Sequence, residues 1–261
     1  MGHIRVGTLP NTPRWGQVVE VLSDEGTSAA AVAGATMQAA ERGLQVASHD
    51  EGLCYTVWLL SHITLAARRD DLAAALNNIG VFVPHEPSVF DIVGGFSDAM
   101  DNHLRQTAGR TDIGEMAQIA ATETLARLCT AKSRTLFKTT STDVKEAIRS
   151  FSTKRGFSDL AHDFFSGLTQ KYLTYHLGRE LSNHVGEGRR FHDPGEHAEF
   201  IDRLGTHCRQ VALIVKEFAG GWHSKANYED GISHVKARNF AWAAMKKIRA
   251  ELSRRGASGV G

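Results

Sequence analysis

A stretch without proline runs from residue 88 to residue 193, long enough for several helices. Proline breaks the interior of an α-helix, so its absence favours long helices here. Apolar residues in nearly every segment also recur with a period of about 3.6 residues, whereas strands would show a period of two. We therefore predict an all-α protein, a multi-helix bundle of about eight to nine helices. Its longest and most central helix is expected near 157–184.

Helix start and stop signals refine this prediction. Thr12 and Asp193 each precede a proline at the first helical position, where proline is favoured. Asp143 with Glu146 is expected to form a capping box. Gly220-Gly221 is expected to end a helix that begins at 194. The alanine-rich run at 29–40 predicts a close contact between two helices, because small side chains let two backbones approach.

The charge of the chain is unevenly distributed. Residues 1–130 carry eight Lys plus Arg and fifteen Asp plus Glu, a balance of −7, while residues 131–261 carry 22 and 14, a balance of +8. Such an asymmetry could dock the halves against each other, drive head-to-tail association, or attract an anionic partner. We predict an acidic helical part at 1–136 and a basic helical part at 137–256, which together could form one compact domain. A disordered tail is expected at 257–261.

Two loops are predicted to carry binding residues. If helices 157–184, 194–219 and 233–255 pack as antiparallel neighbours, their ends gather at two poles. The first pole would bring Arg189 and Arg190 to Arg254 and Arg255 as an anion site, and ion pairs with nearby acids are the structural alternative. The second pole would be a long loop with Trp222, His223 and Lys225 as binding residues. Trp222 could instead be a hydrophobic plug at the end of the bundle.

The last helix is predicted to present a basic surface. It is rich in Lys and Arg, and Glu251 is its one acid before residue 256. Plotted at 100° per residue, Lys236, Lys247 and Arg254 lie opposite the apolar stripe. The pattern is that of a solvated amphipathic helix, and the lack of acids makes it the strongest predicted surface for nucleic acid or an acidic partner.

Arg179 and His184 are separated by four residues at the end of the predicted long helix. This Arg-x4-6-His spacing resembles that of the HEPN ribonucleases, which are all-helical proteins. The resemblance covers six residues and implies metal-independent attack of a ribose 2′-hydroxyl on the adjacent phosphate. Imidazole would move the proton and guanidinium would hold the phosphate. On an unbroken helix the two side chains point about 140° apart, so the pair requires the helix to end before His184.

Other patterns bear on cofactors and location. His176, Glu180 and His184 share a helical face but lack HExxH or repeated ExxH spacing, so we predict no metal site and no cofactor. Three isolated cysteines fit a reducing compartment, and residues 1–6 do not resemble a signal peptide, which predicts a cytoplasmic protein. No apolar stretch is long enough to span a membrane.

These observations favour a non-enzymatic binding or accessory subunit that presents its basic C-terminal region to a protein or nucleic-acid partner. A homodimer is compatible with the charge asymmetry. The alternative is the HEPN-like ribonuclease, a toxin or antiviral effector using Arg179 and His184.

Overall fold

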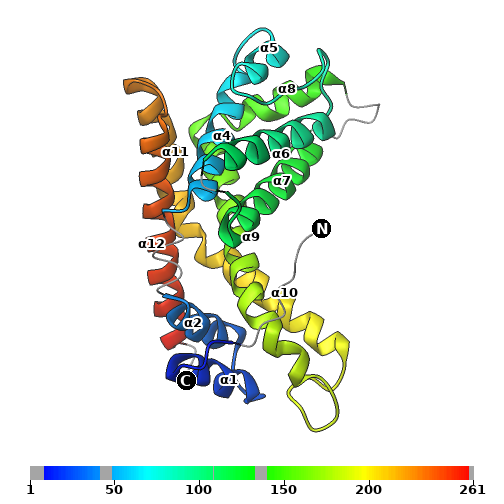
Figure 1. Ribbon diagram of the computed structural model, residues 1–261, viewed down its shortest axis with the longest axis vertical. Helices are drawn as coiled ribbons and strands as arrows, with labels where there is room; N and C mark the ends of the chain where they lie inside the picture. The colour runs from blue at the N-terminus through cyan, green and yellow to red at the C-terminus, as the bar shows by residue number, and fades with distance from the viewer. Residues whose placement is uncertain (1–8, 42–48, 108, 133–139, 259–261) are drawn as a thin grey trace.

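The computed structural model describes residues 9–41, 49–107, 109–132 and 140–258, and these residues form helices and no strand. The predicted all-α fold class and the multi-helix bundle are confirmed (Figure 1). The helices are α1 (Pro13–Ser23), α2 (Ala29–Ala39), α4 (Glu51–Ala66), α5 (Leu72–Asn77), α6 (Val89–Gln106), α7 (Asp112–Lys132), α8 (Ser141–Ser150), α9 (Lys154–Leu181), α10 (Pro194–Val211), α11 (Leu213–Glu229) and α12 (His234–Ser258).

Helix caps agree with the sequence signals at two of the three predicted positions. Thr12 caps α1 and Asp193 caps α10, each followed by proline. The capping box of α8 lies three residues earlier than predicted, because Thr140 and Asp143 exchange the two hydrogen bonds. Asp143 is therefore the N3 acid of this box, and its carboxylate is not the cap.

The central position predicted for residues 157–184 is occupied by α9. It begins three residues earlier, at Lys154, and ends at Leu181. It packs against α11 on one side and against α7 and α10 on others, so its leucines are fully enclosed (Figure 1). Contact on several sides gives α9 the central position that the sequence predicts.

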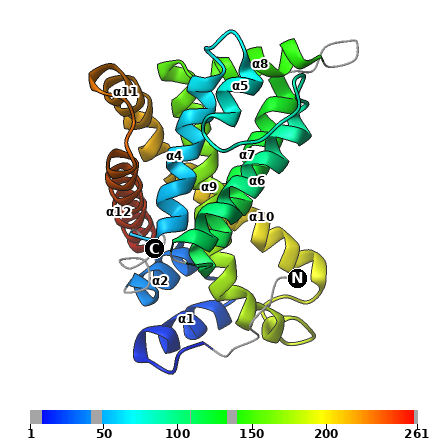
Figure 2. The ribbon, with the colours of Figure 1, turned by 45° about the horizontal axis from the view of Figure 1, so that its top comes forward.

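The alanine-rich helix α2 lies across the C-terminal end of α12, at the end of the molecule that also contains α1 (Figures 1 and 2). A Cβ built on Gly34 would lie 2.9 Å from the Cα of Gly256 and 3.3 Å from the carbonyl oxygen of Leu252. The predicted close contact between two helices is therefore confirmed, and its partner is α12. Gly256 continues the helix, which includes residues 257–258 of the predicted disordered tail.

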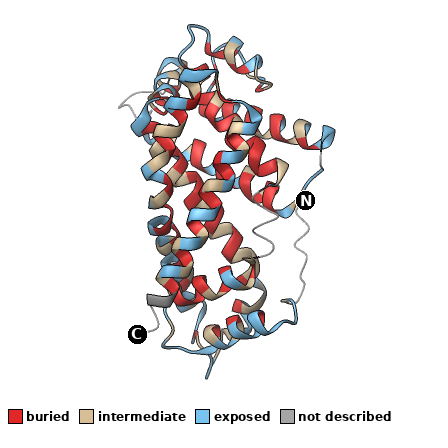
Figure 3. Cartoon of the chain, turned by 90° about the vertical axis from the view of Figure 1, so that its left-hand side faces the viewer, coloured by how far each residue is buried: buried red, intermediate tan, exposed pale blue. Residues whose placement is uncertain are grey.

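Helices from the acidic and the basic parts contribute to one hydrophobic cluster, which extends from Trp15 to Leu252. In Figure 3 buried residues line the faces that neighbouring helices share, and exposed residues lie on the outside. α2 and α4 pack on α12, and α7 packs on α9. The predicted boundary at 136 falls within 133–139, outside the described residues. None of the described helices is long and apolar enough to cross a membrane.

Candidate functional site

The predicted loop after Gly221 is a helix. α10 ends at Val211, a turn at Ala212 follows, and α11 then continues through both glycines to Glu229. Gly220 lies against the first turn of α9, where a Cβ would overlap the Lys154 carbonyl oxygen and lie 2.7 Å from the Ser158 Oγ. The prediction of a stop was wrong because Gly220 serves a close helix crossing.

Two of the residues predicted for that loop belong to the core. Trp222 is half-buried and stacks on Phe240 with ring centroids 4.1 Å apart. His223 is buried, stacks on Phe157 at 4.0 Å, and has its Nε2 3.3 Å from the Thr64 hydroxyl. Burial lowers the pKa of His223 to about 4, so its imidazole is neutral at pH 7. Lys225 is exposed, with its Nζ 3.8 Å from Glu229.

The arginines of the other predicted loop bind backbone carbonyl groups. Arg190 donates to the carbonyl oxygens of Val21, Leu22, Asp24 and Thr27 at distances from 2.6 to 3.1 Å. Arg189 donates to the carbonyl oxygen of Asn183 at 2.6 Å. The N-terminus of α10 is occupied by the Asp193 carboxylate, which accepts from the backbone N–H groups of Gly195 and Glu196.

The predicted pole also placed Arg254 and Arg255 beside this loop, and that placement was wrong. Arg255 donates to the Gln210 side chain at 3.3 Å, near the C-terminal end of α10. Both arginines hydrogen-bond to Glu251, which lowers the pKa of that carboxyl to about 2. α10 packs along α9 but has little contact with α12, so helices 157–184, 194–219 and 233–255 are not the consecutive antiparallel neighbours that we predicted.

Much of the basic charge of the C-terminal part is engaged by acids within the protein. Arg238 pairs with Glu51 at 3.2 Å and Arg249 with Glu41 at 3.5 Å, so α12 docks on acids of the N-terminal part. Lys236 lies against Asp230 and Glu229 in the turn before α12. Lys247 stands over the Phe218 ring, with its Nζ 5.6 Å from the centroid. The charge asymmetry therefore contributes to docking the two parts.

His184 lies in a 3-10 turn, residues 182–184, that follows the end of α9 at Leu181. The side chain of Arg179 is outside the described residues, so the geometry of the Arg179–His184 pair is not defined. Partial burial lowers the pKa of His184; Glu180 opposes this shift, and Arg190 and Arg189 add to it.

A cluster of rings on α4, α6 and α12 escaped the sequence analysis. On α4, Glu51, Tyr55, Trp58 and His62 follow one another at intervals of three or four residues and so share a helical face. Tyr55 stacks on His103 of α6 at 3.7 Å and Trp58 stacks on His62 at 4.0 Å. His234 of α12 completes the set. We call these five aromatic and histidine residues the ring cluster: Tyr55, Trp58, His62, His103 and His234.

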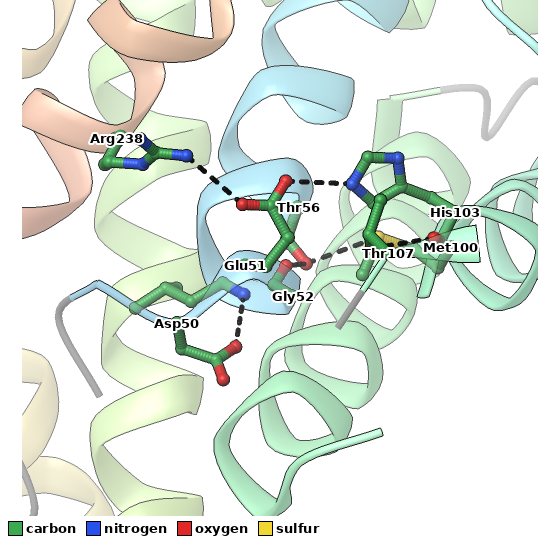
Figure 4. A network of polar contacts seen from close by, with 9 residues as sticks. Asp50, Glu51, Gly52, Thr56, Met100, His103, Thr107 and Arg238 are labelled. Carbon is green, nitrogen blue, oxygen red and sulfur yellow. Dashed lines mark hydrogen bonds and ion pairs between the residues drawn. The ribbon is translucent and has the colours of Figure 1, made fainter. Parts of the chain in front are cut away.

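Glu51 connects the three helices at the edge of the ring cluster. One carboxylate oxygen lies 2.9 Å from the Nε2 of His103, and the other accepts from Arg238 at 3.2 Å (Figure 4). His234 stacks on Trp58 with centroids 4.5 Å apart and interplanar angle 10°. The three elements meet here through polar and ring contacts as well as through the core.

Burial shifts the pKa values of several groups in and beside the ring cluster, and the shift at Cys54 makes it a poor nucleophile. Burial lowers the pKa of His62, and burial together with His103 lowers the pKa of His234. Cys54, beside Glu51 on α4, is buried, and burial raises its pKa to about 11 despite the opposing Arg238. Its thiol is therefore protonated at neutral pH and is a poor nucleophile. Within the described ranges, no group of three or more His, Cys, Asp or Glu residues is arranged to hold a metal ion.

No protein-family model, curated protein or solved structure matches this chain. The spacing of Glu51, Tyr55, Trp58 and His62 was the signal available in the sequence for the ring cluster. The partners of Glu51, His103 of α6 and Arg238 of α12, lie 52 and 187 residues further along the chain.

Proposed function

We propose that this protein is a non-enzymatic binding or accessory subunit and that it contacts a protein partner through the outer face of α12. The observation that carries the proposal is the exposure of two large apolar side chains on that face. Val235 is 61% exposed and Trp242 is 41% exposed. They are seven residues apart, so they share one side of the helix, together with Lys246.

Trp242 and Lys246 form a unit on this surface. The Lys246 Nζ lies 4.8 Å from the centroid of the Trp242 ring, within the range of a cation–π contact. Glu251, the one acid of the helix, is engaged by Arg254 and Arg255. A tryptophan rimmed by lysine suits a partner surface with an apolar pocket and an acidic edge, because interface hot spots are rich in tryptophan.

The distribution of free cations favours protein over nucleic acid as the partner. Non-specific binding to nucleic acid requires several phosphate contacts from lysine and arginine. On α12, Lys236, Arg238, Arg249, Arg254 and Arg255 are all in ion pairs with acids of this chain. Among the described cations of α12, this leaves Lys246 and Lys247 for phosphate contacts, and each of them lies over an aromatic ring.

We expect Trp242→Ala to weaken binding of the partner by at least about 30-fold, the effect of losing a hot-spot residue. The partner is first identified by copurification with the full chain, and its dissociation constant is then measured with both proteins purified. Phe90→Ala is the matched control, because Phe90 is 83% exposed but belongs to α6. Equal affinities for wild type and Trp242→Ala would contradict the proposal. So would binding of single-stranded RNA that is abolished by Lys246→Glu with Lys247→Glu.

One observation favours the ribonuclease as a second candidate. His184 ends the 3-10 turn that follows α9, and it lies close enough to Arg190 and Arg189 for both guanidinium groups to lower its pKa, so an imidazole and two possible phosphate ligands are neighbours here. The lowered pKa of His184 also keeps its imidazole neutral near pH 7, as a general base requires.

For this second candidate, we expect purified protein to cleave RNA in the presence of a chelator, and His184→Ala to remove at least about 99% of the activity. His192→Ala is the control, since His192 is an exposed histidine eight residues away. Circular dichroism verifies that both variants stay folded. Absence of cleavage by the wild-type protein, or equal activity in His184→Ala, would exclude this role.

A further inference from the structure

A second feature lies at the opposite end of α4 from Glu51. An open pocket with a volume of about 800 Å³ lies between the end of α4, the short helix α5 and the turn from α11 to α12. It is at the end of the molecule where α5 and α8 are labelled in Figure 1. Its volume is within the range of about 300–1,000 Å³ that small-molecule sites occupy.

The pocket contains two arginines and one carboxylate. Arg68 is anchored, because its Nε donates to the Ser152 Oγ at 2.8 Å and a terminal nitrogen donates to the Ser152 carbonyl oxygen. Arg69 has no ion-pair partner within the described part of the chain. The carboxylate is Asp71, which is engaged as the N-cap of α5 and accepts from the backbone N–H of Ala74. The excess charge in the pocket is therefore positive.

His62 joins this pocket to the ring cluster. Its Nδ1 lies 2.8 Å from the Trp58 carbonyl oxygen, so this nitrogen carries the hydrogen and donates it. The stacking of its ring on Trp58 fixes the ring plane. The Nε2 is then the nitrogen left to accept a proton or a hydrogen bond from a ligand. Protonation there would add a third positive charge to the pocket wall.

The rest of the lining is apolar with two amides. Asn78, the C-cap residue of α5, and Asn227 of α11 supply amide donors and acceptors. The apolar lining residues are Leu65, Ala66, Ala74, Ala75, Ile79 and Ile232. A pocket with this composition offers an apolar surface to the body of a ligand and a cationic corner to its headgroup.

We propose that this pocket binds a small organic phosphate monoester, with the phosphate between Arg68, Arg69 and His62 and the apolar body against Leu65 and Ile79. Two guanidinium groups with an imidazole match a dianionic headgroup better than a single carboxylate, because Arg69 can donate to two oxygens and Arg68 keeps N–H groups on its terminal nitrogens that Ser152 does not use. The site is separate from the outer face of α12 and does not depend on the proposed protein partner.

The test uses phenyl phosphate as the probe, with calorimetry for affinity and NMR of the His62 imidazole for location. We expect saturable binding, and a rise in the pKa of His62 on saturation, because a bound dianion stabilises the imidazolium. Arg69→Gln is expected to weaken binding at least tenfold. Lys225→Gln, which removes an exposed cation of α11 outside the pocket, is expected to leave affinity unchanged.

Benzyl alcohol and inorganic phosphate separate the two parts of the site. The proposal predicts no binding of the neutral alcohol and weaker binding of inorganic phosphate, which lacks the apolar body. No change in the His62 signals up to about 10 mM phenyl phosphate, enough to fill a millimolar site, would overturn the proposal. Equal affinity in wild type and Arg69→Gln would overturn it as well, since binding would then take place elsewhere.

Discussion

Gly220→Ala is expected to destabilise the protein by at least about 3 kcal/mol, at the upper end of the range for overpacked cores. A Cβ at this position overlaps the Lys154 carbonyl oxygen and approaches the Ser158 Oγ to 2.7 Å. The Lys154 oxygen belongs to the backbone of the first turn of α9, so this clash cannot be relieved by rotating a side chain. Thermal unfolding followed by circular dichroism should show a melting temperature about 6–12 °C lower.

The neighbouring glycine is the matched control. Gly221 is in the same turn of α11, but a Cβ there meets no atom within 4 Å. Gly221→Ala is therefore expected to stabilise the protein by about 0.5–1 kcal/mol, the difference in helix propensity between the two residues. If both substitutions had the same small effect, residues 220–221 would not lie in a helix packed on α9, and the loop inferred from the sequence would be the better description.

Arg190→Ala is expected to destabilise the protein by about 2–3 kcal/mol. The guanidinium donates to four carbonyl groups, of which Val21 and Leu22 belong to the last turn of α1. It also lies 4.9 Å from the Phe200 ring centroid. Its loss leaves the α1 carbonyl groups without these donors and removes a positive charge from the C-terminal end of that helix. Denaturant unfolding gives the size of the effect, and hydrogen exchange of the α1 amides gives its location.

Two further substitutions separate geometry from charge at this position. Arg190→Lys keeps the charge but is expected to lose most of the stability, because one ammonium group cannot donate to carbonyl groups on two sides as the guanidinium fork does. Arg189→Ala removes an exposed arginine that donates to one carbonyl group, and about 0.5 kcal/mol is expected. Equal effects of Arg189→Ala and Arg190→Ala would show that α1 does not depend on this contact.

Gly34 and the pair Gly220-Gly221 show where local sequence signals predict a helix contact correctly and where they do not. Gly34 lies in an alanine-rich run, and many small residues together already predict a close helix contact. Gly220-Gly221 is an isolated pair, and the same dipeptide is compatible with a helix end or with a helix crossing. Only the presence of Lys154, 66 residues earlier in the chain, makes the helix crossing the correct interpretation.

The candidate sites depend on tertiary structure more than the fold does. The arginines at 189 and 190 were identified as important, yet their ligands are carbonyl groups of this chain rather than an external anion. The ring cluster combines residues of α4, α6 and α12. The pocket beside His62 adds residues of α5 and α11. No periodicity within one helix reveals which ring of another helix will face it.

The sequence by itself determined the all-helical class, the caps at Thr12 and Asp193, and the central position of α9, because apolar period, proline and capping residues act over a few neighbouring positions. The tertiary structure decided that α11 runs past its glycines, that the opposite charges of the two parts pair across α4 and α12, and which surfaces remain exposed. The physical reason is the sequence separation over which each feature is determined. Caps and helical faces are set by residues within about four positions, whereas a carbonyl, a carboxylate or a ring acquires its partner only when distant segments pack together.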